Sequence, residues 1–297
     1  SHATLRPLVH PGQSPPEPRY RPSTALARFI RCRDRTCRFP GCTRPVTDID
    51  VWFADRDAVC AAAEVLHPLG YVPAPSGGEL TTWQKAFDKS SNGHKIRIDA
   101  HWALFNSALL NNVMPFDAAV ARSQPLGLQA QTPKALSSED ALINAIGHRA
   151  LKQLSGQADT LKWLVDQQLL FKSLDSGQWQ ALLQRCADAG ISDLALEALE
   201  QSQRIFRIPV PPDVRETLAC NAGRERIKRR WFRSWPRYQW HEMQAVSPLY
   251  SVRLRWLTQK LLPNPEAMRE GYGEHDPAWR FMLRRFGIGL KRLFSWN

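Results

Sequence analysis

The sequence lacks long apolar runs. Its 297 residues contain no stretch of about eighteen consecutive apolar residues, which argues against a membrane-spanning helix. The first residues are rich in proline and arginine and contain no apolar core of the kind that secretory signals carry. We therefore expect a cytoplasmic protein.

Cysteine is also scarce, and its placement is uneven. Six cysteines occur, and three of them lie between Cys32 and Cys42. Disulfide frameworks are typical of short, cysteine-dense secreted chains, so this pattern instead indicates reduced thiols or a metal site. The hydrophobic content of 43% is sufficient for a buried core and predicts one large or two modest globular domains.

Positive charge is concentrated at the two ends of the sequence. Residues 1–47 carry nine arginines against two acids, a net +7, and residues 215–297 carry seventeen lysines and arginines against seven acids, a net +10. Since the total is +12, the middle has a net charge of −5. Clustered basic residues displace counterions from phosphates, which makes RNA or DNA a candidate partner. Improved solubility is the alternative reason for basic ends.

Two aspartates interrupt a run of β-branched and aromatic residues at positions 47–53. Side chains alternate between faces along a strand, so Asp48 and Asp50 are expected to point the same way, roughly 7 Å apart. Mg²⁺ prefers oxygen ligands and commonly takes one or two carboxylates together with substrate phosphates. The aspartate pair is therefore a candidate metal site.

A second predicted strand, at positions 94–102, supplies a third acid. Asp99 and His101 share one face of this strand because they are two residues apart. A third carboxylate from a neighbouring strand would complete a site for two divalent ions, with Asp48, Asp50 and Asp99 as ligands. His101 is a candidate for contact with metal or substrate, and ordinary partial burial is the alternative.

The order of these motifs resembles that in a known family. The motif DIDV at 48–51, a helix ending near Gly70 and the motif IDAHW at 98–102 resemble the nucleotidyltransferase superfamily, in particular a bacterial branch with DIDLLV and VDLHW signatures. The resemblance runs from about residue 48 to the end of the sequence. It implies an α/β (α+β) fold with a small mixed sheet, flanking helices and a mostly helical C-terminal region. It also implies transfer of a nucleoside monophosphate from an NTP, with two Mg²⁺ ions bound by the three carboxylates.

The same resemblance extends to a third stretch of the family, written H…LKWL.D. It places His148, Lys162 and Asp166 at the border of the active-site cleft as substrate-binding residues. The spacing of Lys162 and Asp166 is also that of an i, i+4 pair on one helix face, so a solvent-facing ion pair is the alternative.

A different resemblance covers about the first fifty residues. The stretch Arg31–Cys42 resembles the opening of an HNH endonuclease domain of actinobacterial type, which implies zinc binding by Cys37 and Cys42. The match stops at Asp50, because Val51 stands where the nuclease has histidine and no later cysteine or histidine pair completes a tetrahedral zinc site. A natural fusion and a chimeric sequence are both compatible with this pattern.

Periodicity and composition divide the sequence into four parts. We expect a Pro/Arg-rich, HNH-like segment at 1–46, a catalytic core at 47–133, a helical domain at 134–208 and a basic, aromatic-rich region at 209–297. Apolar spacing and capping residues predict helices at 55–69, from 137 onwards, and at 160–171, 178–189 and 192–206.

The basic C-terminal region mixes guanidinium groups with aromatic rings at 224–238 and again at 280–296. Aromatic rings among arginines are typical of proteins that grip unpaired bases. A basic amphipathic helix on an anionic surface and simple packing onto the helical body are the alternatives.

Three functions remain open at this level. The first is a metal-dependent nucleotidyltransferase acting on tRNA, protein or a small molecule. The second is an HNH-type nuclease with an incomplete motif. The third is an inactive transferase fold that binds nucleic acid, because the small-residue phosphate-binding loop that the family places before Asp48 is absent.

Overall fold

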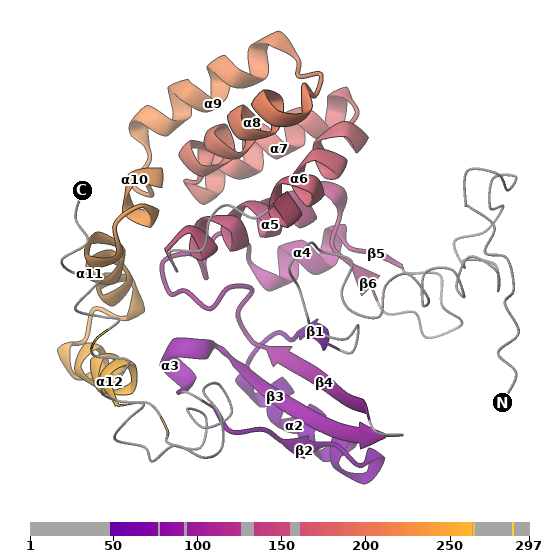
Figure 1. The fold of residues 1–297 in the computed structure, drawn as a ribbon, viewed down its shortest axis with the longest axis vertical. Coiled ribbons are helices and arrows are strands. Elements are labelled where there is room, and N and C mark those ends of the chain that lie inside the picture. The colour runs from indigo at the N-terminus through magenta and orange to yellow at the C-terminus, as the bar shows by residue number, and fades with distance from the viewer. Residues whose placement is uncertain are drawn as a thin grey trace, which may run out of the picture. The chain divides into compact units, whose positions relative to one another are not determined.

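The computed structural model describes residues 48–262 except 77, 92–93, 126–133 and 155–160, together with residues 264 and 287 (Figure 1). The chain divides into two units, Ser1–Asp48 and Ile49–Asn297, and the second contains nearly all of the described residues. The HNH-like segment, with Cys37 and Cys42, and nearly all of the basic stretch 280–296 lie outside the described residues.

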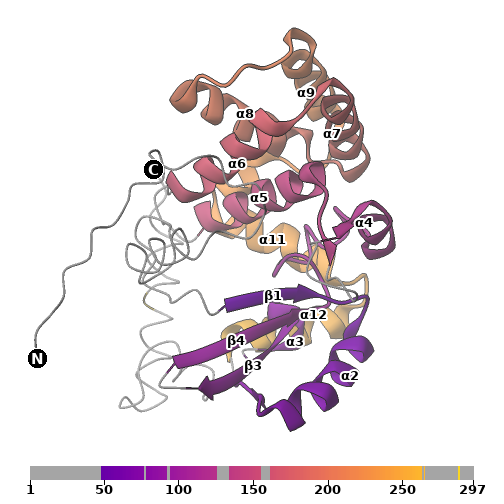
Figure 2. The same ribbon diagram turned by 90° about the vertical axis from the view of Figure 1, so that its right-hand side faces the viewer.

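A four-stranded sheet forms the first part of the second unit. Its strands are β1 (Asp48–Trp52), β2 (Val72–Pro73), β3 (Gln84–Ser91) and β4 (His94–His101), in the order β1-β4-β3-β2. β4 and β2 both pair antiparallel with β3. The Phe53 amide donates to the His101 carbonyl at 2.8 Å, so the carboxyl ends of β1 and β4 meet and the two strands run parallel. The predicted small mixed sheet is therefore confirmed, and both ribbon views show β1 beside β4 (Figures 1 and 2).

Strand β3 is not among the strands that were predicted from the periodicity of the sequence. It pairs with β4 along its whole length, from Gln84 opposite His101 to Ser91 opposite His94. The dipeptide at 92–93 between the two strands is Asn-Gly, which is the strongest short-range sequence signal for a hairpin. The strand that carries Asp99 is thus an inner strand of the sheet, with β1 on one side and β3 on the other.

Helix α2 (Arg56–Leu66) covers one face of the sheet. The Asp55 side chain caps it by accepting from the Ala58 amide at 2.8 Å. A 3₁₀ turn follows and ends at Gly70, whose φ of 85° lies in the left-handed region that glycine adopts readily. Val59 of the helix packs with Phe87 and Ala100 of the sheet in a small buried cluster. The opposite face of the sheet is left for polar side chains.

The rest of the described chain is almost entirely helical, as expected from the apolar periodicity. Two short strands, β5 (Gln124–Pro125) and β6 (Lys134–Ala135), form a separate antiparallel pair. The helices after α2 are α3 (Glu79–Thr82), α4 (Phe116–Arg122), α5 (Ser138–Gln153), α6 (Leu161–Ser173), α7 (Ser176–Ala189), α8 (Ser192–Phe206), α9 (Pro212–Arg224), α10 (Arg229–Phe232), α11 (Trp235–Val246) and α12 (Tyr250–Leu261).

Local sequence signals account for several of these helix ends. The Ser137 hydroxyl accepts from the Asp140 amide at the start of α5. Asp175 and Gln178 form a reciprocal capping box at the start of α7, and Gly190 ends this helix with a φ of 66°.

One large hydrophobic core joins the helices. It contains fully buried side chains of α5, α7, α8 and α10, among them Leu142, Leu182, Leu199 and Phe232. Phe232 and Tyr238 belong to the basic aromatic stretch 224–238, and both are buried in this core. For these two rings, packing onto the helical body is therefore confirmed.

A buried carboxylate ties α11 to the segment that follows β4. Glu242 is 1% exposed and accepts from the Ser107 hydroxyl at 2.8 Å and from the Ala108 and Leu109 amides at 2.8 and 3.1 Å. The Tyr238 hydroxyl, one turn earlier, donates to the Ser107 hydroxyl at 2.9 Å. The C-terminal helices thus support the segment that leaves the sheet at its polar face.

None of the helices in the described part of the chain combines the length and apolarity needed to span a bilayer.

Candidate functional site

Two aspartates and a histidine meet where β1 and β4 run side by side. Asp50 lies on β1, and Asp99 and His101 lie on β4. One oxygen from each carboxylate and one ring nitrogen of His101 lie within 4.8 Å of one another. These are the side chains that strand alternation places on one face of parallel neighbours, and the structure brings them together.

The contact between the two strands is direct. His101 Nε2 lies 3.0 Å from Asp50 Oδ1. The His101 side chain is only 12% exposed, whereas the Asp50 side chain is 75% exposed. His101 Nδ1 is buried and has no hydrogen-bond partner among the described residues. We therefore assign the ring proton to Nε2, from which it is donated to Asp50, so that a fixed imidazole orients an accessible carboxylate.

The donor set suits a divalent cation. Magnesium takes oxygen ligands and is often held by one or two carboxylates plus substrate phosphates, which Asp50 and Asp99 match. Imidazole is a better ligand for zinc, copper or iron than for magnesium. The contact of His101 with Asp50 makes it an orienting group for a carboxylate ligand, a role that outer hydrogen bonds commonly have at metal sites.

The same face of the sheet also carries a charged cluster. Arg97 holds Asp88 through two hydrogen bonds of 2.8 Å, and Lys95 Nζ lies 2.8 Å from the same carboxylate. Burial acts to raise the pKa of Asp88, but the hydrogen bonds and charges of Arg97 and Lys95 outweigh it, so the pKa lies below its ordinary value. Sequence reasoning missed Asp88, because its place opposite Arg97 depends on the β3–β4 register.

The other residues predicted for the site have different settings. The backbone of Asp48 begins β1 and that of Lys162 lies in α6, and the side chains of both are outside the described part of the structure. His148, on α5, lies between two aromatic rings, with its centroid 5.4 Å from Phe105 and 5.8 Å from Trp163. Asp166 is half-buried on α6. The roles of these four residues stay predictions.

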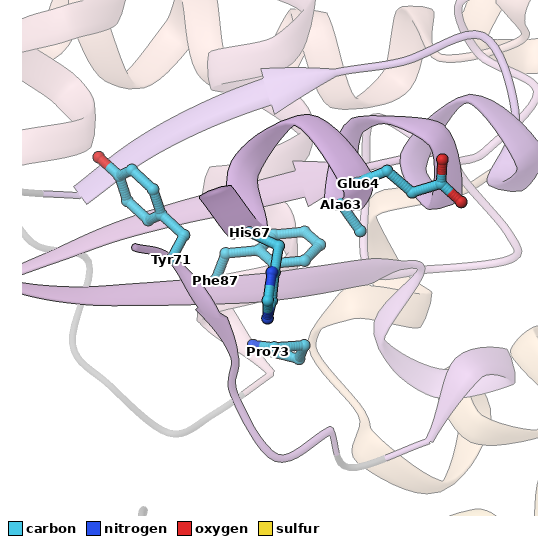
Figure 3. Close-up of a pocket in the computed structure, with 6 residues that line it drawn as sticks. All are labelled: Ala63, Glu64, His67, Tyr71, Pro73 and Phe87. Carbon is cyan, nitrogen blue, oxygen red and sulfur yellow. The ribbon is translucent and has the colours of Figure 1, made fainter. Parts of the chain in front are cut away.

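A cavity of about 400 Å³ lies on the opposite face of the sheet, between α2 and the strands β2 and β3. Figure 3 shows its lining, in which the Glu64 carboxylate points away from the ring of Phe87. Phe87 pairs with Ile98, the neighbour of Asp99 that faces the other way. The sheet therefore separates this cavity from the carboxylates. Its lining residues are Ala63, Glu64, His67, Tyr71, Pro73 and Phe87.

Two sets of similarities bear on this arrangement. Three proteins of Mycobacterium tuberculosis, among them the uncharacterized proteins Rv3776 and Rv2100 of strain H37Rv, are each 53% identical to the chain over 49 residues. That match spans 16% of this chain and 9% of each relative, so the chain matches only a small part of these proteins. No solved structure matches the chain.

The second set concerns a whole family. The profile of a family described as "Uncharacterised nucleotidyltransferase" matches residues 42–207, which is more than half of the chain and includes all three residues of the cluster. These similarities do not support the HNH resemblance of the first fifty residues, so we do not propose an HNH fusion. The chain belongs to this uncharacterised nucleotidyltransferase family.

Proposed function

We propose that the protein is a metal-dependent nucleotidyltransferase that moves a nucleoside monophosphate from an NTP to an acceptor hydroxyl. The observation that carries the proposal is the convergence of Asp50, Asp99 and His101 on one face of two parallel strands, in a chain of this family. Residues 47–133 are the catalytic core in this proposal, and the helices that follow support it.

In this proposal Asp48 joins the three residues of the cluster, and the four side chains serve as metal ligands or as an orienting group. Asp48, Asp50 and Asp99 hold divalent metal, and His101 keeps the Asp50 carboxylate in place through the 3.0 Å contact. A metal held there would supply positive charge to offset that of the NTP phosphates. Asp99 accepts the proton of the acceptor hydroxyl as that oxygen forms its bond to the α-phosphorus and pyrophosphate leaves. Asp50 is open to solvent, so a substrate can reach it.

The basic segments suit a polyanionic acceptor. Residues 1–47 and 215–297 have net charges of +7 and +10, and lysine and arginine at such density attract phosphate backbones. A tRNA or another RNA is the acceptor class that this charge distribution favours. The contribution of the basic segments to acceptor binding should weaken as the salt concentration is raised, because counterion release drives such contacts.

A labelling experiment tests the transfer. The protein is incubated with each α-³²P-labelled NTP and Mg²⁺, with total tRNA and then the protein itself as acceptor. Label should appear with the wild type, disappear with EDTA, and disappear in Asp50→Asn. Asp57→Asn is a matched control, because Asp57 is an exposed aspartate in the first turn of α2 and lies outside the cluster. Absence of label with all four NTPs, in protein shown to be folded, would reject the transferase proposal.

A further inference from the structure

A second cavity, at the carboxyl ends of β1 and β4, is walled by tryptophan. It has a volume of about 420 Å³, within the range of small-molecule sites, and Trp52, Trp83 and Trp102 line it. All three are half-buried. The remaining wall comes from the segment after β4 and from the end of α11, including Asn111 and Asn112. Three indole rings provide extended planar surfaces for a flat ligand.

The cavity lies at the ends of the strands that carry the acids. Trp52 is two residues after Asp50 on β1, so the two side chains share a face and their backbones are roughly 7 Å apart. Trp102 directly follows His101, and its amide donates to the Trp83 carbonyl at 3.1 Å. The separation between the backbones of Asp50 and Trp52 is within the span of one nucleotide. The base of a nucleotide can therefore occupy the cavity while its phosphates lie at the carboxylate cluster.

Two of the indole groups have unused donors. Trp52 Nε1 and Trp83 Nε1 are buried and have no hydrogen-bond partner among the described residues. Buried donors in proteins almost always have an acceptor, and each exception calls for an explanation. Heterocyclic bases present ring nitrogens and carbonyl oxygens at their edges, and these are acceptors of the kind that the two N–H groups lack.

The backbone at Trp83 is strained. Its φ of 51° lies in the left-handed region, which is unfavourable for a bulky side chain with a Cβ atom. Such strain persists where surrounding contacts hold it, and it concentrates at functional sites. Here the strained residue joins α3 to β3 and places an indole in the wall of the cavity.

We infer that the cavity walled by Trp52, Trp83 and Trp102 binds the base of the nucleotide whose phosphates meet the Asp50–Asp99 carboxylates. The base stacks on indole, as bases do on aromatic platforms in other nucleic-acid-binding proteins. This inference rests on the proposed transferase function and adds the residues that hold the nucleoside.

Isothermal titration calorimetry with nucleosides tests the pocket separately from the chemistry. Adenosine, guanosine, cytidine and uridine are titrated into the full chain in EDTA, so that neither phosphate nor metal contributes. At least one nucleoside should bind. Trp83→Ala should weaken its binding by about 5- to 150-fold, the usual range for loss of one stacking ring. Trp83→Phe keeps a ring and should lose less.

Two controls define the result. Trp240→Ala removes a tryptophan that is 60% exposed on α11 and should leave binding unchanged. Asp50→Asn should also leave nucleoside binding unchanged while it abolishes transfer. If Trp83→Ala does not fold, the comparison uses Trp83→Phe and Trp52→Phe, whose melting curves establish folding.

The outcomes separate the two proposals. If the wild type transfers nucleotide but binds none of the four nucleosides, or if the tryptophan variants bind as tightly as the wild type, the inference about the pocket is overturned and the transferase proposal stands. Nucleoside binding that is lost in the tryptophan variants, in a protein with no transfer activity, would support the pocket and reject the transferase.

Discussion

At the scale of single residues, the site depends on one contact between strands that are distant in sequence. His101 is 12% exposed and Asp50 is 75% exposed, so the histidine is the fixed partner and the carboxylate is the accessible one. The imidazole has a buried edge at Nδ1 and a hydrogen bond at Nε2. A histidine held in this way limits the rotamers of Asp50 and prepares the carboxylate to bind metal.

His101→Ala should therefore reduce metal affinity and not only the rate of transfer. Loss of an outer hydrogen bond at a metal site typically costs about 10- to 100-fold in affinity or activity. We expect the Mg²⁺ concentration for half-maximal transfer to rise by that factor. His67→Ala is the control, because His67 lies at the cavity on the opposite face of the sheet. An unchanged Mg²⁺ dependence in His101→Ala would contradict the orienting role.

At the scale of elements, the β3–β4 hairpin organises the polar face. Its register places Asp88 opposite Arg97 and Gln84 opposite His101. The hairpin therefore places a charged partner, Asp88, and a neutral polar partner, Gln84, beside β4 on the face that carries Asp99. In helix α5, the close packing of one side chain depends on a glycine, because Gly147 leaves room for the ring of Phe105.

The stability of the hairpin should depend on pH through Asp88. The folded state holds its pKa below the ordinary value of 3.8, so its contribution to stability is complete above the unfolded pKa and is lost as pH falls through the folded pKa. Asp88→Asn should lower the free energy of unfolding at pH 7. Urea denaturation at several pH values measures the difference, which should shrink below about pH 4. A constant difference from pH 7 to pH 2 would contradict this account.

Gly147→Ala should destabilise the protein by about 1–3 kcal/mol, the usual cost of overpacking a core. A Cβ atom at Gly147 would lie 2.6 Å from Cζ of the buried Phe105 ring. The matched control is Gly223→Ala on α9, where a Cβ atom meets nothing within 4 Å. This control should be neutral or stabilising, because alanine favours helix over glycine. Chemical denaturation of the two variants compares them, and equal stability losses would refute the packing argument.

At the scale of the whole second unit, the C-terminal helices support the site. The family match ends at residue 207, yet Glu242 on α11 accepts three hydrogen bonds from the segment Ser107–Leu109. That segment borders the tryptophan-walled cavity, to which Ala245 and Val246 of α11 also contribute. The chain beyond the matched region is therefore part of the structure that shapes the site.

Glu242→Ala should cost several kcal/mol of stability, because it leaves a buried hydroxyl, a buried amide and a partly buried amide without their acceptor, at about 1–3 kcal/mol each. Glu242→Gln retains one acceptor oxygen and should cost less. Thermal and urea unfolding measure both variants. Trp240→Ala, on the exposed face of the same helix, serves as the control. If Glu242→Ala unfolds like the control, the buried contact has no structural importance.

Local features of this protein could be predicted from its sequence. Strand alternation placed Asp50 apart from Ile49 and placed Asp99 with His101, because the side-chain period of a strand is two. Asp55, Ser137 and Gly190 marked helix ends through their own hydrogen bonds or backbone freedom. Each of these signals acts within about four residues, so the order of residues alone carries it.

The tertiary structure decided what no local signal encodes. The 3.0 Å contact of Asp50 with His101 joins residues 51 positions apart, and the contact of Glu242 with Ser107 joins residues 135 apart. Trp52, Trp83 and Trp102 become walls of one cavity only because β1 and β4 end, and β3 begins, at the same edge of the sheet. Periodicity assigns a side chain to a face, whereas strand order, register and packing of the whole chain determine which faces meet.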